Sequence, residues 1–263
     1  MTESRTQAVL PGTDFHLFTS AIADDEFEVL IAPLRRADDQ GKRYPVVYAP
    51  DANSTFAWIV HTAGTMMVGG ELPEMIVVGI GHPIGSILTE PAALQKFFQA
   101  RTWHLTPTAG EAGGGGGAEK FLGFIRDELI PFVDSNYPTN PEDRTLLGYS
   151  YGGLFSVYAL LNNPEIFDRY VAGSPSLGFD DGVIFQHERA SAASRPSLPV
   201  KLFMSAGSLE SEKTLSNVEQ MVEALKGRNY EDLDLTSVVF PDETHVSAIG
   251  GTLSRGLRAV FQG

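Results

Sequence analysis

The sequence predicts an α/β fold in which helices cover both faces of a mostly parallel sheet. Short β-branched runs such as "YPVVYAPD" (44–51) and "EMIVVGIGH" (74–82) alternate with longer apolar segments of helical length. The first two runs, 14–22 and 26–34, follow one another without a helix between them, which is typical of antiparallel strands. Because no Pro/Ser-rich linker divides the chain, we expect a single domain spanning residues 1–263.

The expected elements follow in a regular order. After the two antiparallel strands, the polar stretch "RRADDQGKR" (35–43) carries hairpin-turn chemistry. The later elements are expected as strand 44–51, helix 56–68, strand 74–82, helix 118–133, strand 144–149, helix 152–162, strands 168–174 and 200–206, helix 212–227, strand 234–240 and helix 246–261. In parallel sheets of this kind, ligand sites form at the carboxyl ends of the strands.

One segment departs from the alternation. Residues 82–117 contain a short helical patch, an aromatic stretch with a histidine, and five consecutive glycines from Gly113 to Gly117. A loop of this length in a compact domain is typical of a functional or a disordered segment. No Lys-Ser or Lys-Thr follows the glycines, as a phosphate-binding loop would require. We interpret the segment as a lid or loop insertion with a flexible glycine tether.

Composition and charge exclude several classes of function. The chain has 33 acidic and 19 basic residues, a formal net charge of −14, which disfavours nucleic acid as a partner. It has no cysteine, so disulfides, thiolate zinc sites and a cysteine nucleophile are excluded. The first residues lack the pattern of a secretory signal, and no apolar run approaches the ~18 residues of a membrane span. We therefore expect a cytoplasmic protein without a membrane partner; the sequence leaves a homo-oligomer open.

The sequence "RTLLGYSYGGLFSVYALL" (144–161) contains the strongest candidate for a nucleophile. Ser150 lies in a G-x-S-x-G pattern between a predicted buried strand and a predicted apolar helix. In a nucleophile elbow the chain turns sharply from strand to helix, and glycines at positions such as Gly148 and Gly152 permit close packing around that turn. The alternative is a serine that caps a core helix. The strand-to-helix context favours the elbow and hence nucleophilic catalysis by Ser150.

A serine hydroxyl needs a base to remove its proton as it attacks. In folds of this type the partners follow the serine in the order acid, then histidine, which leaves His187 and His245. His187 lies in the helix-like, charged stretch "IFQHERA", which is typical of a surface. His245 lies in a loop directly after the last predicted strand, at the edge where ligand sites form. We therefore predict His245 as the general base.

The acid that orients this histidine is expected after the preceding strand. Glu210 follows strand 200–206 in "GSLE", where its carboxylate can accept the Nδ1 proton of His245. Glu212 is the first alternative, although it suits the first turn of the next helix, where the helix dipole stabilises an acid. Asp180 and Asp181 are a second alternative, and a Ser–His dyad without an acid is the third.

Acyl transfer also places negative charge on the carbonyl oxygen, which two backbone N–H groups usually stabilise. One donor is expected at Tyr151, directly after the nucleophile. The other is expected in the loop "YAPDANSTF", at Asn53 or at its neighbour Ala52.

These segments together resemble the α/β-hydrolase "putative esterase" family, which includes esterase D, enterochelin esterase-like hydrolases, feruloyl esterases and mycolyltransferases. The resemblance covers most of the chain beyond residue 40, through "YPVVYAPDANSTF", "LTPT", "FLGFIRDELIPFVDSNY", the Ser150 region, "GSLE" and "ETH". It implies an eight-stranded, mostly parallel sheet and a serine esterase mechanism that uses Ser150, Glu210 and His245. It implies no cofactor and no metal.

Two departures from the family pattern concern the substrate. Ala52 replaces the usual glycine of the oxyanion loop. Trp103 and His104 stand where relatives often carry a charged pair, which indicates a more aromatic, neutral pocket, and we expect these two residues and Tyr149 to bind substrate. The predicted function is hydrolysis of a small-molecule carboxylic ester. The alternatives are an acyltransferase that uses the same triad and a non-catalytic binding domain of the same fold.

Overall fold

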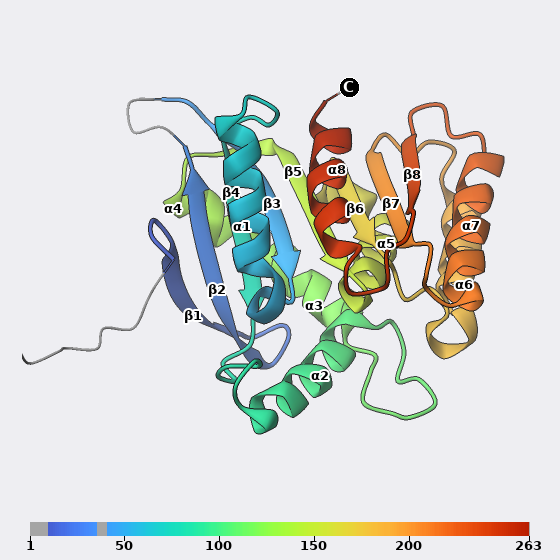
Figure 1. The fold of residues 1–263 in the computed structure, drawn as a ribbon, viewed down its shortest axis with the longest axis horizontal. Helices are drawn as coiled ribbons and strands as arrows, with labels where there is room; N and C mark the ends of the chain where they lie inside the picture. Colours follow the sequence, from blue (N-terminus) through green and yellow to red (C-terminus); the bar gives the residue numbers. More distant parts are fainter. Residues whose placement is uncertain (1–9, 36–40, 263) are drawn as a thin grey trace, which may run out of the picture.

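The computed structural model describes residues 10–35 and 41–262, and its centre is an eight-stranded sheet (Figure 1). The strands are β1 (Asp14–Ser20), β2 (Asp25–Leu34), β3 (Tyr44–Pro50), β4 (Met75–Gly81), β5 (Thr139–Tyr149), β6 (Arg169–Gly173), β7 (Lys201–Gly207) and β8 (Asp234–Phe240). Their order in the sheet is β1-β2-β4-β3-β5-β6-β7-β8. β1 pairs antiparallel with β2 and β2 with β4, whereas all other neighbours pair parallel. This confirms the expected mostly parallel sheet.

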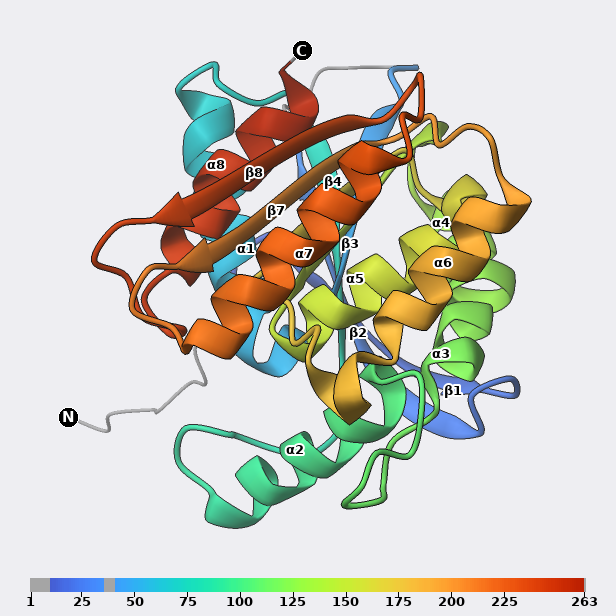
Figure 2. The same ribbon diagram turned by 90° about the vertical axis from the view of Figure 1, so that its right-hand side faces the viewer.

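Helices pack on both faces of the sheet (Figures 1 and 2). They are α1 (Ala52–Val68), α2 (Pro91–Leu105), α3 (Ala118–Phe124), α4 (Ile130–Asn136), α5 (Tyr151–Asn162), α6 (Ile184–Ser194), α7 (Glu212–Gly227) and α8 (Ile249–Phe261). A π-helical turn, Ile125–Leu129, joins α3 to α4, and 3-10 turns lie at Pro164–Ile166 and Phe179–Gly182. α1 and α8 cover one face, and α3 to α7 cover the other.

The strand sequences explain why the sheet is covered twice. In β3, Val46 and Tyr48 belong to the core beneath α3 to α7, whereas Val47 and Ala49 belong to the core beneath α1 and α8. Side chains of a strand point alternately to opposite faces, so a strand that is apolar at every position needs a layer on each side. The central strands are therefore held rigidly, and their carboxyl ends form a fixed edge for a site.

The hairpin expected at 35–43 is wrong. β2 does not pair with β3, because β4 lies between them. The hairpin of this region joins β1 to β2 instead, with Ser20 paired to Asp25. The Asp-Asp-Gln part of the expected turn lies outside the described residues. Turn-forming residues thus predicted a change of direction there, but not which strand would be the neighbour.

The insertion at 82–117 contains α2, a helix of 15 residues, where only a short helical patch was expected. The buried residues of α2 are Ala93, Phe97, Arg101, His104 and Leu105. They lie at helical spacing, but two of them are polar residue types, so the hydrophobic pattern hides the buried face. α2 lies beyond the carboxyl ends of the central strands (Figure 1).

Elsewhere the expected elements occur with shifted ends. The helix expected over 118–133 consists of α3, the π-helical turn and α4, and it continues to Asn136. The final helix begins at Ile249 rather than at 246. The helix-like stretch around His187 is α6. In the described parts of the chain, no helix combines the length and the apolar character needed to cross a membrane.

Candidate active site

Ser150 lies at the turn between β5 and α5, with backbone angles of φ 60° and ψ −116°. This conformation is rare for a residue with a side chain and stores strain. Backbone hydrogen bonds hold it in place, since Ser150 N–H donates to Gly173 O at 2.9 Å and Ser150 O accepts from Leu154 N–H at 2.9 Å. Its side chain makes no capping hydrogen bond to α5, so the geometry is that of a nucleophile elbow and not of a helix cap.

The glycines around the turn have unequal roles. A Cβ on Gly148 would lie 1.9 Å from the carbonyl oxygen of Gly152, so no larger residue fits there. A Cβ on Gly152 would make an ordinary 3.4 Å contact with Asp51 Oδ2. At Gly153 it would lie 2.7 Å from Gly173 O. The sequence pattern therefore identified one close approach, at Gly148, while the second lies at Gly153 and not at Gly152.

Glu210 and His245 come together at the same edge of the sheet. His245 Nδ1 lies 2.7 Å from Glu210 Oε2. The Glu210 carboxylate is almost wholly buried, with 2% of its side chain exposed, whereas 45% of the His245 side chain is exposed. A buried carboxylate bound to Nδ1 holds the imidazole in the tautomer whose Nε2 can accept a proton. The pair therefore has the geometry of an acid and the base that it orients.

Close contact between two loops produces this pair. Gly207 ends β7, and a Cβ on it would lie 2.3 Å from Glu243 O, so the loop after β8 can reach it only because this residue is glycine. Leu209 N–H donates to Glu243 O at 2.9 Å, which fastens the two loops together. Because β7 and β8 are parallel neighbours, both loops leave from the same edge.

Three donors surround the Glu210 carboxylate. Besides His245, the N–H of Gly207 and the hydroxyl of Ser174 donate to Oε1, at 2.8 and 2.7 Å. Burial raises the pKa of Glu210, but the hydrogen bonds from His245, Gly207 and Ser174 together outweigh it, so the pKa lies below its ordinary value. Glu210 is therefore ionised near neutral pH, as an acceptor for the His245 proton must be.

The alternative acids and histidine lie elsewhere. Glu212 is the first residue of α7, and its side chain is exposed to solvent. Asp180 and Asp181 lie in the 3-10 turn before α6, and the Asp180 carboxylate accepts a hydrogen bond from Thr108 at 2.6 Å. His187 is half-buried on α6, and its Nδ1 forms a hydrogen bond of 3.0 Å with Asn162. Among these candidate acids, Glu210 is the residue that forms a hydrogen bond with His245.

Both residues expected to supply oxyanion donors lie in the first turns of helices. Asn53 is in the first turn of α1 and Tyr151 is the first residue of α5. The first N–H groups of a helix have no partner within the helix, so they are free to point at an anion. The Asn53 side chain is held by the backbone of His82, which it meets through two hydrogen bonds of 2.9 and 2.8 Å.

A buried ion pair that the sequence pattern did not reveal supports these helix starts. Asp51 has a left-handed φ of 60° and caps α1. Arg101 of α2 donates to both oxygens of its carboxylate, at 3.0 and 2.7 Å. The guanidinium carbon of Arg101 lies 5.0 Å from the centre of the Tyr151 ring. Burial disfavours the Arg101 charge, but Asp51 more than offsets this and raises the pKa of Arg101. A fixed positive charge therefore lies beside Tyr151.

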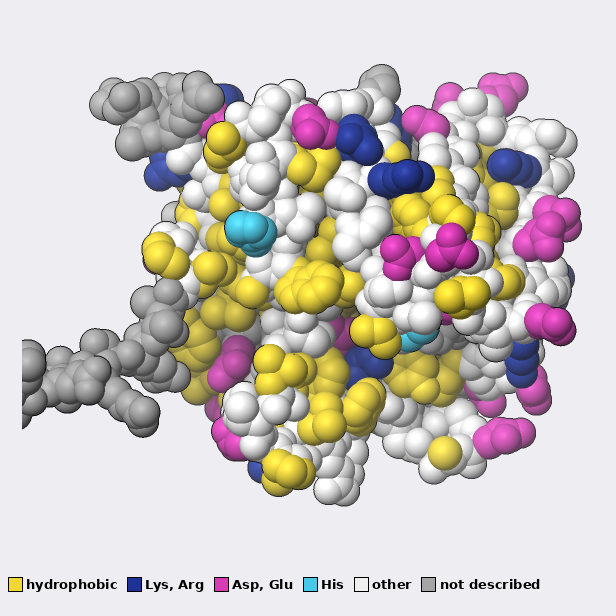
Figure 3. Space-filling view, in the orientation of Figure 1, with side chains coloured by type: hydrophobic (Ala, Val, Ile, Leu, Met, Phe, Trp, Pro, Cys, Tyr) yellow, Lys and Arg dark blue, Asp and Glu magenta, His cyan; other side chains and the backbone are white. Residues whose placement is uncertain are grey.

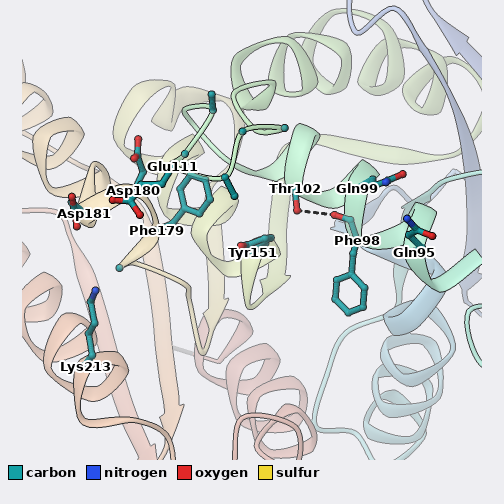
Figure 4. Close-up of a pocket in the computed structure, with 16 residues that line it drawn as sticks. Gln95, Phe98, Gln99, Thr102, Glu111, Tyr151, Phe179, Asp180, Asp181 and Lys213 are labelled. Carbon is teal, nitrogen blue, oxygen red and sulfur yellow. Dashed lines mark hydrogen bonds between the residues drawn. The ribbon is translucent and has the colours of Figure 1, made fainter. Parts of the chain in front are cut away.

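A cavity of about 630 Å³, which we call the Tyr151 cavity, opens beside Tyr151. Figure 4 shows Phe98, Gln95 and Gln99 of α2 at one end and Phe179, Glu111, Asp180 and Asp181 at the other, with Tyr151 between them. In Figure 3 hydrophobic side chains gather over α2 and along its junction with the rest of the molecule. Four large ones in segment 88–103 are at least 40% exposed: Leu88, Leu94, Phe98 and Trp103.

The three residues expected to bind substrate do not line the Tyr151 cavity. The Trp103 ring packs against Gly117, where a Cβ would lie 2.9 Å from ring atoms Cε2 and Nε1. His104 is 1% exposed, and its Nε2 lies 2.9 Å from Asp25 Oδ2. The hydroxyl of Tyr149 donates to the backbone oxygen of His245 at 2.7 Å. The half-exposed Phe98, about one and a half helical turns before Trp103, is an aromatic residue that does line this cavity.

The glycine run is packed on one side and lines the Tyr151 cavity on the other. A Cβ on Gly115 would lie 2.3 Å from Thr106 Oγ1. Gly117 N–H donates to Trp103 O at 2.8 Å, which closes the loop onto the end of α2. Gly113 and Gly114 line the cavity with positive φ angles of 73° and 85°. The glycines thus serve close approach and left-handed turns as well as any freedom to move.

Asp25, His82 and His104 form the group with metal-ligand chemistry among the described residues, with one ligand-type atom from each lying within 4.8 Å of the others. The His104 hydrogen bond to Asp25 uses two of these atoms, and the His104 ring stacks on that of His82 at 5.1 Å. Burial lowers the pKa of His82 to about 4, and burial also lowers the pKa of His104 despite Asp25. Both rings are therefore neutral near pH 7, and the His104 ring packs against the rings of His82, Phe27 and Phe121.

Comparisons with known proteins agree with this fold. The chain matches the family model described as "Putative esterase" over residues 20–202. It is 28% identical to the ferri-bacillibactin esterase BesA of Bacillus subtilis over 95% of this chain and 89% of that protein. It is 31% identical to a siderophore enterobactin esterase of Emericella nidulans over 84% of this chain and 83% of that protein. The crystal structure of the BES protein from Bacillus cereus has a TM-score of 0.86 at 24% identity, over 100% of both chains.

The sheet order, the helical layers and the elbow at Ser150 define the α/β-hydrolase class. The chain belongs to the "putative esterase" family, in its enterochelin esterase-like type. It is accordingly an esterase, an enzyme that hydrolyses carboxylic esters.

Proposed function

We propose that the protein is a serine esterase that hydrolyses siderophore esters through an acyl-enzyme on Ser150, with His245 as base and Glu210 as orienting acid. The observation that carries this proposal is the 2.7 Å hydrogen bond between His245 Nδ1 and the buried Glu210 carboxylate, at the sheet edge where the strained Ser150 lies. The choice of substrate is supported by the siderophore esterases among the relatives, including a triacetylfusarinine C esterase of Aspergillus fumigatus that is 30% identical.

In the first half of the reaction, Ser150 Oγ attacks the ester carbonyl carbon while its proton passes to His245 Nε2. The carbonyl oxygen becomes an oxyanion, which the N–H groups of Tyr151 and Asn53 stabilise, aided by the nearby positive charge of Arg101. Collapse of the tetrahedral intermediate breaks the ester C–O bond, and His245 gives its proton to the leaving alcohol. Glu210 remains ionised throughout and stabilises the imidazolium.

In the second half, water replaces the alcohol. His245 removes a proton from water, whose oxygen attacks the acyl-enzyme carbon, and the second tetrahedral intermediate releases the carboxylic acid as Ser150 regains its proton. An acyltransferase would use an alcohol or thiol in this step. The half-exposed side chain of His245 supports water as the acceptor, because solvent reaches the base directly.

The purified enzyme should be tested with ferri-bacillibactin, enterobactin and triacetylfusarinine C beside p-nitrophenyl and feruloyl esters, with products identified by mass spectrometry. We expect at least one siderophore ester to be cleaved with a higher kcat/KM than the simple esters. Added alcohols and thiols should not replace water as the main acceptor. Turnover of the simple esters alone would contradict the substrate class, and dominant acyl transfer would contradict hydrolysis.

Replacing Arg101 should lower turnover. Arg101→Met leaves the Asp51 carboxylate buried without its partner and removes the positive charge beside Tyr151. We expect kcat/KM to fall about 10²-fold, which is the cost of displacing a reacting group by ~1 Å, and Arg101→Lys should not restore it, because lysine cannot make the two-pronged contact. Arg126→Met is a matched control, since Arg126 forms a similar pair with Asp127 on the surface. Equal losses in both proteins would refute a specific role for Arg101.

Phe98 should influence the choice among esters. It lines the Tyr151 cavity and is 52% exposed, so Phe98→Ala should change the ranking of kcat/KM values across the ester panel while shifting the free energy of unfolding by less than about 1 kcal/mol. Trp103→Ala is the comparison, because Trp103 is on the same helix but packs against Gly117. If Trp103→Ala changes the ranking of the substrates and Phe98→Ala does not, the substrates bind beside Trp103 and not in the part of the cavity that Phe98 lines.

A further inference from the structure

We propose that Tyr149 and Ser174 are positioning residues that hold both the backbone and the imidazole of His245 through one closed ring of polar contacts. This inference rests on the proposed function of His245 and Glu210. The ring runs from the His245 imidazole to Glu210 at 2.7 Å, from Glu210 to Ser174 at 2.7 Å, from Ser174 to Tyr149 at 2.8 Å, and from Tyr149 to the His245 backbone oxygen at 2.7 Å. It starts and ends on the same residue.

Rigid elements anchor the members of the ring. Tyr149 is the last residue of β5, next to Ser150, and its ring packs on Gly173, where a Cβ would lie 2.5 Å from Tyr149 Cδ2. Ser174 follows β6, is fully buried, has a φ of 37°, and donates its N–H to Ser205 O at 2.8 Å. The His245 loop itself is exposed, so Tyr149 and Ser174 connect a surface loop to the centre of the sheet.

The two hydroxyl groups of this ring have fewer hydrogens than they have polar contacts. Tyr149 and Ser174 supply one hydrogen each, yet they take part in three contacts: Ser174 with Glu210, Ser174 with Tyr149, and Tyr149 with the His245 oxygen. Because a carboxylate and a carbonyl oxygen can only accept, the Ser174 hydrogen points to Glu210 Oε1 and the Tyr149 hydrogen points to the His245 backbone oxygen. The 2.8 Å contact between the two hydroxyl oxygens therefore has no hydrogen of its own.

The two hydroxyl groups hold different parts of His245. Ser174 donates to the Glu210 carboxylate, which orients the imidazole. Tyr149 donates to the backbone oxygen of His245 and so holds the loop that carries the imidazole. Neither hydroxyl touches the reacting atoms, so both act through position.

The test compares Tyr149→Phe, Ser174→Ala and the double variant with the wild type, in kcat, KM and the pH profile of kcat/KM. Loss of the Ser174 hydrogen bond to the charged Glu210 should lower kcat by about 10- to 100-fold. Loss of the Tyr149 hydrogen bond to the neutral backbone oxygen of His245 should lower kcat by about 3- to 10-fold. KM should stay within about twofold in both variants. Ser174→Ala removes one of the hydrogen bonds that lower the pKa of Glu210, so this pKa should rise and the acid limb of the pH profile should move to higher pH. The double variant should lose little more than the worse single variant, because both act through one network.

Two control variants lose the same chemical groups away from the ring. Ser205→Ala removes a fully buried hydroxyl that bonds Thr252 at 2.8 Å, and Tyr170→Phe removes a buried phenol that bonds Pro164 O. Both should keep the wild-type pH profile. If Ser174→Ala does not fold, Tyr149→Phe decides the question, because the phenylalanine ring still packs on Gly173.

Three results are distinguishable. A displaced acid limb in Ser174→Ala, with non-additive losses and unaffected controls, supports the network. Wild-type kcat and pH profiles in both single variants overturn it, while leaving the proposed triad in place. A Ser150→Ala preparation that still turns over substrate overturns the proposed function and the network together.

Discussion

Replacing Ser150 with alanine should abolish ester hydrolysis, with a loss of about 10⁶-fold in kcat. The change removes the attacking oxygen, and the Ser176 hydroxyl, whose oxygen lies 3.5 Å from Ser150 Oγ, follows β6 and not the strand-to-helix turn. Alanine meets the same backbone constraint as serine at φ 60°, so the fold and the midpoint of thermal unfolding should stay close to those of the wild type. Stopped-time product assays with a siderophore ester, together with circular dichroism, measure both effects.

Ser211→Ala is the informative control for this change. Ser211 is a true helix cap, because its side chain accepts from Thr214 N–H at 3.1 Å. Loss of such a cap costs about 1 kcal/mol of stability and should leave most of the turnover. Turnover near the wild-type rate in Ser150→Ala would show that the elbow serine is not the nucleophile.

Glu210→Gln should have the second largest effect, a fall of about 10⁴-fold in kcat, which is the cost of losing the useful histidine tautomer in a comparable triad. The amide keeps the size of the side chain but can donate to His245 Nδ1, which then places the proton on Nε2. His245 Nε2 then carries a proton and cannot accept the proton of Ser150. Measurement of kcat across neutral pH, with fold checked by thermal unfolding, separates this from a loss of stability.

Glu212→Gln is the matched control, two residues away on the exposed start of α7. It should turn over at nearly the wild-type rate. Equal losses in the two variants would mean that neither carboxylate orients His245 specifically. A larger loss in Glu212→Gln would transfer the role to that residue.

The sequence predicted the central sheet well because its strands carry their own signal. Runs such as Val46–Val47 and Ile76–Val78 are apolar at every position, and such runs belong to strands buried on both faces. The neighbour of β2 could not be predicted in the same way, because strand pairing depends on contacts between distant segments. The chemistry of the turn after β2 therefore suggested a hairpin, while β4 occupies that place.

Backbone position at the site could be predicted from the sequence, whereas side-chain direction could not. Ser150, Glu210 and His245 each follow a strand, so topology alone predicts that they gather at one edge. The contacts of Tyr149, Trp103 and His104 could not be predicted, because each contacts a residue outside its own helix or strand: His245, Gly117 and Asp25 respectively. Arg101 was missed because hydrophobic patterns hide a polar residue on a buried helix face.

The most direct test of serine catalysis is the mass of the enzyme after reaction with a fluorophosphonate probe, followed by fragmentation of the peptide that contains Ser150. We expect one adduct per chain, located on Ser150, which forms rapidly in the wild type and in Glu212→Gln and slowly in Glu210→Gln. Loss of ester hydrolysis should parallel the extent of labelling. An enzyme that hydrolyses esters at full rate with Ser150 unlabelled, or that carries its adduct on a different residue, would contradict this expectation.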